Sequence, residues 1–112
     1  MNAAEPWKTT FDTEIRRATD ARLAGNEGMA RVCARRAAGV LVGEYLKRRG
    51  IDPGTPSAYD QLLYLSGLPG ISPQVAQTTH LLLMRITPEH TLPEEADLIA
   101  EALRLRQELV GE

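Results

Sequence analysis

One stretch of this chain, residues 26–50, carries a helical pattern longer than any other in the sequence. Asn26 is placed to cap a helix, because its side-chain oxygen can accept a backbone N–H of the first turn. Gly50 is placed to end the helix in a left-handed conformation, and Pro53 prevents its continuation. Small residues recur along the stretch: Ala30, Ala34, Ala38, Gly39 and Gly43. The pattern therefore predicts a long central helix that other backbone segments approach closely.

Four further segments carry helical signals. A first helix is expected over about residues 10–23, and the short break after it predicts an antiparallel hairpin with the central helix. Glycine and proline punctuation separates two shorter helices, one near residues 57–68 and one from Ser72 to about Arg85. A last helix is expected to begin at Pro93, where acidic residues favour the positive end of the helix dipole.

Length and composition point to one compact unit. A chain of 112 residues is the size of a single domain, and 43% hydrophobic residues are enough for one core. Aromatic residues make up only 4%, so the core must be mainly aliphatic. We predict one all-α domain over residues 1–112, an up-and-down bundle of four to five helices. Residues 1–8 are expected to be disordered or frayed, or else loosely docked with Trp7 packed on the bundle.

Charge and cysteine content narrow the functional classes. A net charge of −2 gives no bulk attraction to nucleic acid or to an anionic membrane. Charged residues interrupt the central helix far short of a membrane span, and no signal peptide is visible. The single Cys33 excludes an intramolecular disulfide and fits a reducing compartment, so a cytoplasmic location is expected. Its position on an apolar face makes it a candidate buried hydrophobe.

Metal and cofactor signatures are missing from the sequence. Two histidines and one cysteine do not make a Cys/His zinc site, and no Walker-type glycine-rich loop is present. We therefore expect neither a metal nor a cofactor.

Arg85 and His90 are the candidate catalytic pair. An arginine can donate to phosphoryl oxygens, and a histidine with a pKa of about 6.5 can move a proton. Cleavage of RNA through its own 2′-hydroxyl would need little else. The alternative is that Arg85 neutralises the C-terminal end of its helix and His90 is an ordinary loop residue.

A candidate binding patch lies on the central helix. Arg31 and Arg35 are neighbours on one helical face, and Arg36 lies about 100° further round. Together they could bind phosphate. The alternative is a solvated face whose arginines pair with acids such as Glu27 or Glu14.

The pattern as a whole resembles the HEPN family, the nucleotide-binding helical domain of higher eukaryotes and prokaryotes. Residues 11–51 are similar to its opening hairpin, an Ala-rich helix that leads through a Gly-containing turn into a second Ala-rich helix with a basic, Gly-terminated end. Residues 57–65 resemble its short third element, and residues 85–88 and 94–110 its Arg-x-x-Pro-type loop and final helix. The matching hairpin residues are Ala18, Ala21, Gly25, Ala30, Ala34, Ala37, Ala38, Leu46, Lys47 and Gly50.

The resemblance implies a four- or five-helix up-and-down bundle that is often a homodimer. Members of the family cleave RNA in toxin–antitoxin or phage-defence systems, or bind nucleotides or RNA without catalysis. Catalytic members carry Arg-x4–6-His, a spacing that Arg85 and His90 match. Here Pro88 and Pro93 place His90 in a loop, as in members without nuclease chemistry.

Three functions are therefore expected, in this order. The first is a dimeric, non-catalytic module that binds RNA, a nucleotide or a partner protein such as a nucleotidyltransferase. The second is a metal-independent ribonuclease, and the third a purely structural interaction domain. The central and final helices are the expected dimer surfaces.

Overall fold

The computed structural model describes residues 5–84 and 96–112, and all regular structure within them is helical. Five helices follow one another along the described chain, which confirms the predicted all-α class. Their bounds are α1 Pro6–Leu23, α2 Glu27–Arg48, α3 Ala58–Ser66, α4 Pro73–Leu83 and α5 Leu98–Val110. No described helix has the length and apolarity that crossing a membrane requires.

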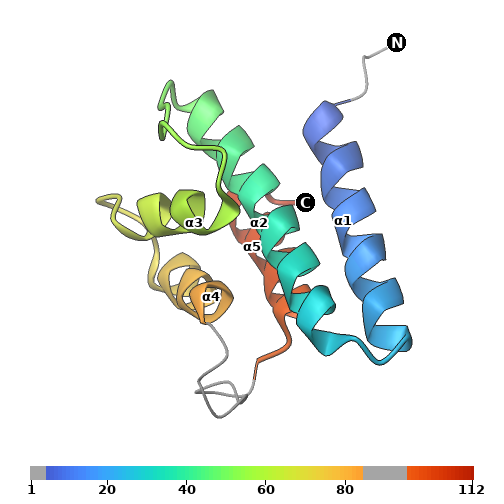
Figure 1. The fold of residues 1–112 in the computed structure, drawn as a ribbon. Coiled ribbons are helices and arrows are strands. Elements are labelled where there is room, and N and C mark those ends of the chain that lie inside the picture. Colours follow the sequence, from blue (N-terminus) through green and yellow to red (C-terminus); the bar gives the residue numbers. More distant parts are fainter. Residues whose placement is uncertain (1–4, 85–95) are drawn as a thin grey trace.

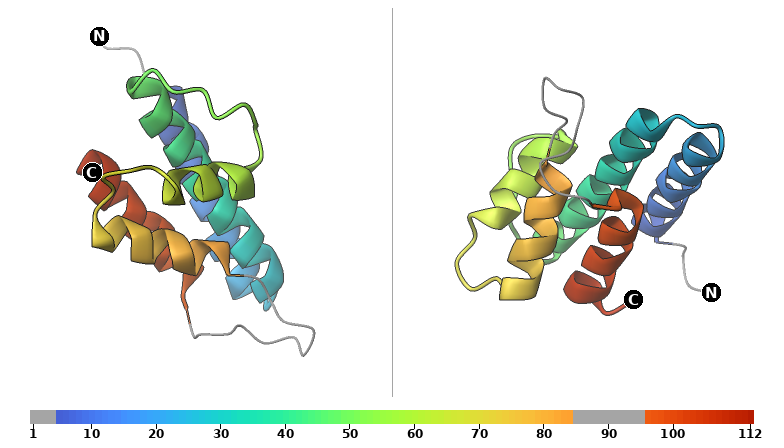
Figure 2. Two further views of the ribbon diagram at one scale, coloured as in Figure 1. Left: turned by 90° about the vertical axis from the view of Figure 1, so that its left-hand side faces the viewer. Right: turned by 90° about the horizontal axis from the view of Figure 1, so that it is seen from below.

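The five helices are arranged around α2. Helices α1 and α2 form an antiparallel hairpin, and α5 packs behind α2 on the side away from α3 (Figure 1). Helix α3 lies across α2 rather than along it, and α4 packs between α3 and α5 (Figure 2). The bundle therefore departs from a simple up-and-down order after α2, because the short helices α3 and α4 turn across its axis.

The central helix begins and ends where its sequence signals place it. The Asn26 side chain accepts the backbone N–H of Met29 at 3.0 Å, and Gly50 adopts a φ of 72° just beyond the C-terminal turn. The small residues bring α3 close. A Cβ atom added to Gly39 would lie 2.5 Å from Ala58 Cβ and 2.7 Å from its Cα. Helix α3 therefore begins in direct contact with the α2 backbone.

Two predicted helix starts are wrong. Helix α1 begins at Pro6, four residues before the predicted start, so residues 6–8 are folded rather than frayed. Trp7 is only 7% exposed, which confirms the alternative that it packs on the bundle. Proline suits this first position because a first-turn N–H has no helical partner. Helix α5 begins at Leu98 rather than Pro93, because Asp97 caps it by accepting the N–H of Ala100 at 3.2 Å.

The core is aliphatic, as the composition predicts, with one aromatic contribution from α1. Phe11 and Trp7 join side chains from all five helices, and the Ala-rich faces of α2 fill much of the centre. Apolar spacing along the helices would turn four large side chains toward the core, but all four are exposed: Leu23, Met29, Leu63 and Leu103. Helix α2 packs against α1, α3 and α5, and Met29 near its N-terminal end stays 45% exposed.

One ionic cluster ties three helix ends together. The Arg22 guanidinium donates to both carboxylate oxygens of Glu27, at 3.0 and 2.8 Å, and to Asp97 at 3.0 Å. The cluster joins the end of α1 to the starts of α2 and α5. The hydrogen bonds from Arg22 hold the pKa of Glu27 below its usual value. For Asp97, burial opposes the shift, but the Ala100 N–H and Arg22 still leave its pKa lowered.

We expect this cluster to make the fold sensitive to acid. A carboxyl whose folded pKa is depressed adds stability above its unfolded pKa, near 4, and that stability is lost as the pH falls through the folded pKa. The free energy of unfolding should therefore fall below about pH 4. Solvent screening of the exposed carboxylates limits the contribution to about 1 kcal/mol. Urea unfolding from pH 3 to 7 should show a shallower acid limb for Arg22→Ala, and an unchanged limb would contradict the expectation.

Candidate functional site

The three arginines predicted as one binding site, Arg31, Arg35 and Arg36, meet different surroundings. Arg35 turns inward onto the end of α4. Arg36 is exposed and lines a hollow with Glu14 of α1 and Ala58 of α3. Arg31 is half-buried, and its Nε has no hydrogen-bond partner in the described residues. They do not form a single exposed phosphate patch.

Arg35 acts as a structural cap. Its Nε donates to the carbonyl oxygen of Leu82 at 2.8 Å, and one of its terminal nitrogens donates to the carbonyl oxygen of Met84. These carbonyls belong to the last turn of α4, where helical partners run out. Arg35 therefore joins α2 to α4 across 47 and 49 residues of sequence.

The two carboxylates predicted to pair with these three arginines pair mainly with other cations. Glu27 binds Arg22, although the charge of Arg31 also helps to lower the pKa of Glu27. Glu14 lies 3.5 Å from Arg17. The alternative of a solvated arginine face paired with Glu27 or Glu14 is therefore wrong in its pairings, because α1 supplies the nearer cations.

Arg85 and His90 both lie outside the described residues. The catalytic pair consequently stays a prediction from the sequence.

Most other described cations already have carboxylate partners. The ion pairs are Lys8 with Glu5 and Glu112, Arg48 with Glu44 and Glu5, Arg104 with Glu101, and Arg106 with Asp12 and Glu112. Binding of a nucleic acid gains affinity when phosphates are neutralised by free cations. A surface whose cations are already paired offers little of that gain.

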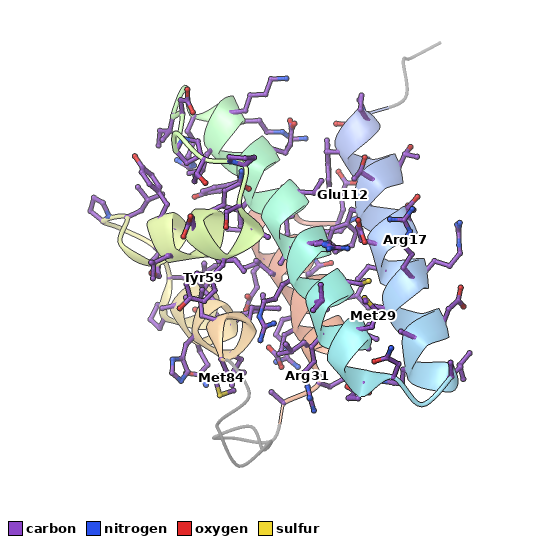
Figure 3. All side chains as sticks on the ribbon, in the orientation of Figure 1. Arg17, Met29, Arg31, Tyr59, Met84 and Glu112 are labelled. Atoms are coloured by element: carbon purple, nitrogen blue, oxygen red, sulfur yellow. The ribbon has the colours of Figure 1, made fainter. Side chains whose placement is uncertain are left out.

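One side of α2 remains uncovered, and we call it the open face. Its residues recur at spacings of three and four, so they share one side of the helix: Met29, Val32, Arg36, Val40, Gly43 and Lys47. Met29 is 45% exposed and Val32 is 37% exposed. Figure 3 shows Arg17 and Met29 on the α1 side of α2, and Tyr59 and Met84 on the opposite side.

Arg36, Val40 and Gly43 of the open face form the floor of a groove between α1 and α3. Glu14 of α1 forms one wall, and Pro56, Ala58 and Gln61 form the other, around a hollow of about 460 Å³. A second hollow of about 420 Å³ adjoins it at Gly43 and Gln61 and extends toward Lys47. The groove is therefore open and partly apolar, and it carries charges of both signs.

Beneath the groove, Cys33 is 2% exposed. Burial raises the pKa of the Cys33 thiol, and the nearby carboxylate of Glu14 raises it further. A thiol that stays protonated and enclosed is a poor nucleophile. This confirms the predicted structural role of Cys33 as a small buried side chain.

The spacing that identifies the open face was present in the sequence, but its meaning depended on the fold. Met29, Cys33 and Ala37 recur every four residues, a spacing that predicts one apolar, core-facing side of the helix. In the structure Cys33 and Ala37 are buried, whereas Met29 is 45% exposed.

Within residues 5–84 and 96–112, no three histidine, cysteine or acidic side chains are grouped closely enough to hold a metal ion. No protein family, curated protein or solved structure matches the chain.

Proposed function

We propose that this chain is a dimeric, non-catalytic helical module, related to HEPN domains, that acts by binding protein through the open face of α2. The observation that carries the proposal is the exposure of two apolar side chains, Met29 and Val32, which lie on the same side of α2 as the groove residues Arg36 and Val40. The first partner we propose for this face is a second copy of the chain.

The charge distribution favours protein over RNA or a nucleotide as the ligand. Arg35 is committed to the carbonyls of α4, and most other described arginines pair with carboxylates. Unpaired Arg36 and Lys47 share their groove with Glu14 and Asp52. A phosphate backbone entering the groove would meet carboxylates as well as cations.

Support for the relation to HEPN domains comes from the hairpin. Helices α1 and α2 are joined by a three-residue turn in which Gly25 has a φ of 80°, and the second helix is Ala-rich and ends in a basic, Gly-terminated segment. The crossing of α3 over α2 departs from the up-and-down order that the resemblance implies.

The ribonuclease alternative rests on Arg85 and His90. Metal-independent RNA cleavage that disappears in both Arg85→Ala and His90→Ala would support it and would overturn the non-catalytic proposal.

The proposal predicts that Val32→Glu abolishes dimerisation. A charge placed among the apolar side chains of the open face would be desolvated when two copies meet, which costs several kcal/mol without a partner. Sedimentation equilibrium at micromolar concentrations should give twice the chain mass of 12.3 kDa for the wild type and the single mass for the variant.

Leu63→Glu is the matched control, because Leu63 is 50% exposed on α3, away from the open face. It should leave the dimer intact. A monomeric wild type would contradict the proposal, as would equal dissociation in both variants.

A further inference from the structure

We infer that two copies of this chain pair through antiparallel α2 helices in a register centred on Arg36, with each Arg36 bound to Glu14 of the other copy. This pairing rests on the proposed function and specifies the interface of the proposed dimer. It assigns a role to two groups that the fold of one chain leaves unmatched.

The first unmatched group is Glu14. Its side chain is 13% exposed, yet its Oε1 is buried, with no strong donor among the described residues and only the nearby thiol of Cys33 to interact with. Its Oε2 lies 3.5 Å from Arg17, whose side chain is 62% exposed. A carboxylate oxygen that is withdrawn from water without a donor is costly, and a donor arriving from outside would relieve that cost.

The second unmatched group is Arg36. It is exposed on the open face and lines the same hollow as Glu14, but it makes no hydrogen bond or ion pair with the described part of the chain. The hollow therefore has an unpaired cation, Arg36, beside the Glu14 carboxylate, whose buried Oε1 lacks a strong donor in the described chain. A two-fold axis brings the same patch of two copies together, so each donor meets the other copy's acceptor.

The open face is also complementary in shape to itself. In antiparallel helices centred on Arg36, Met29 comes level with Gly43 of the other copy, since each lies seven residues from the centre. Val32 comes level with Val40 for the same reason. A long side chain thus meets a glycine, and apolar side chains meet each other.

Gly43 gives the groove floor no side chain of its own, and the Gln61 side chain lies beside it, with Oε1 3.4 Å from a Cβ atom built at that position.

The position of the axis follows from charge. If the two-fold axis that relates the two copies passed directly over α2, the two Arg36 side chains would face each other and repel. An axis displaced toward α1 sets each Arg36 against a Glu14, and the two α1–α2 hairpins then form a four-helix arrangement. A polyanion in the groove would satisfy Arg36 but not the Glu14 oxygen, whereas a second copy satisfies both.

Charge exchange tests the pairing. Arg36→Glu alone and Glu14→Arg alone should each place like charges across the interface twice and weaken dimerisation more than about tenfold. An equimolar mixture of the two variants should form a heterodimer, because both contacts are then between opposite charges. Any repulsion within each single chain remains in the mixture, so recovery reports contacts between chains.

A second measurement keeps the test decisive if Glu14→Arg fails to fold. In a Cys33→Ala background, Met29→Cys chains are mixed with Gly43→Cys chains under mild oxidation. The antiparallel register predicts a disulfide-linked heterodimer and little cross-linking of either variant alone. Within one α2 these positions are about 21 Å apart, too far for a disulfide.

The outcomes separate this inference from the proposed function. A wild type that remains monomeric overturns the dimer itself. A dimeric wild type with no rescue in the charge mixture, or with cross-linking of Met29→Cys to itself in preference to Gly43→Cys, overturns the register and the Glu14–Arg36 contact while the dimer stands.

Discussion

Replacement of Gly39 by leucine is expected to lower the free energy of unfolding by about 3 kcal/mol, at the upper end of the usual cost of overpacking. A Cβ atom at Gly39 would lie 2.5 Å from Ala58 Cβ and 2.7 Å from Ala58 Cα, distances that real structures do not tolerate. The second of these atoms is backbone, so no side-chain rotation can relieve the contact. Helix α3 would have to move away from α2, and the buried contacts of Leu62 and Leu65 would be strained with it.

The effect can be separated from helix propensity within the same helix. Gly28→Leu also replaces a glycine of α2, but the nearest atom to its new Cβ is Asn26 Oδ1 at 3.8 Å. This control should be neutral or slightly stabilising, because leucine exceeds glycine in helix propensity by up to about 1 kcal/mol.

Thermal and urea unfolding should show the Gly39 variant melting about 10 °C lower than the wild type. Adding Ala58→Gly should recover only part of the loss, since the backbone contact persists. Equal stability of the Gly39 and Gly28 variants would mean that α3 does not rest on the α2 backbone.

Local signals predicted α2 well because its boundaries depend on local chemistry. The Asn26 cap and the left-handed Gly50 involve only neighbouring residues, and both are observed. The small residues of the helix predicted a close approach without naming the segment that makes it. The segment that approaches Gly39 is the start of α3 at Ala58, and nothing near Gly39 in the sequence identifies it.

The start of α5 shows why competing local signals are not decisive. Pro93 with the acids that follow it, and Asp97 alone, are both plausible helix starts. Asp97 is the start that the fold uses, and it also binds Arg22, which is 75 residues away in the sequence. A contact over that separation has no local signature.

The candidate site was likewise predicted only where local sequence spacing decides it. The spacing correctly placed Arg31, Arg35 and Arg36 on neighbouring parts of one helix. It did not predict what surrounds each of them. Whether an arginine faces a phosphate, a carboxylate or a carbonyl depends on which helices pack beside it. Helix α4 ends against Arg35, whereas the groove leaves Arg36 exposed.

Arg35→Ala is accordingly expected to reduce stability by about 2 to 3 kcal/mol, rather than to remove a ligand contact. The substitution leaves the carbonyls of Leu82 and Met84 without their guanidinium donor, and both residues are buried. Hydrogen bonds to a charged donor are stronger than neutral ones, and unpaired carbonyls at a helix end are costly once water is excluded. The C-terminal turn of α4 should therefore loosen first.

Hydrogen exchange can locate this loss as well as measure it. Amide protection in residues 79–83 should fall in Arg35→Ala by more than the global change in stability requires, while protection in α1 follows the global value. Arg16→Ala is the control, because Arg16 is an exposed helical arginine without an ion pair in the described chain. It should leave both unfolding and exchange unchanged. If Arg35→Ala were equally neutral, its side chain would be free to bind a ligand, and the predicted arginine patch would regain its most central member.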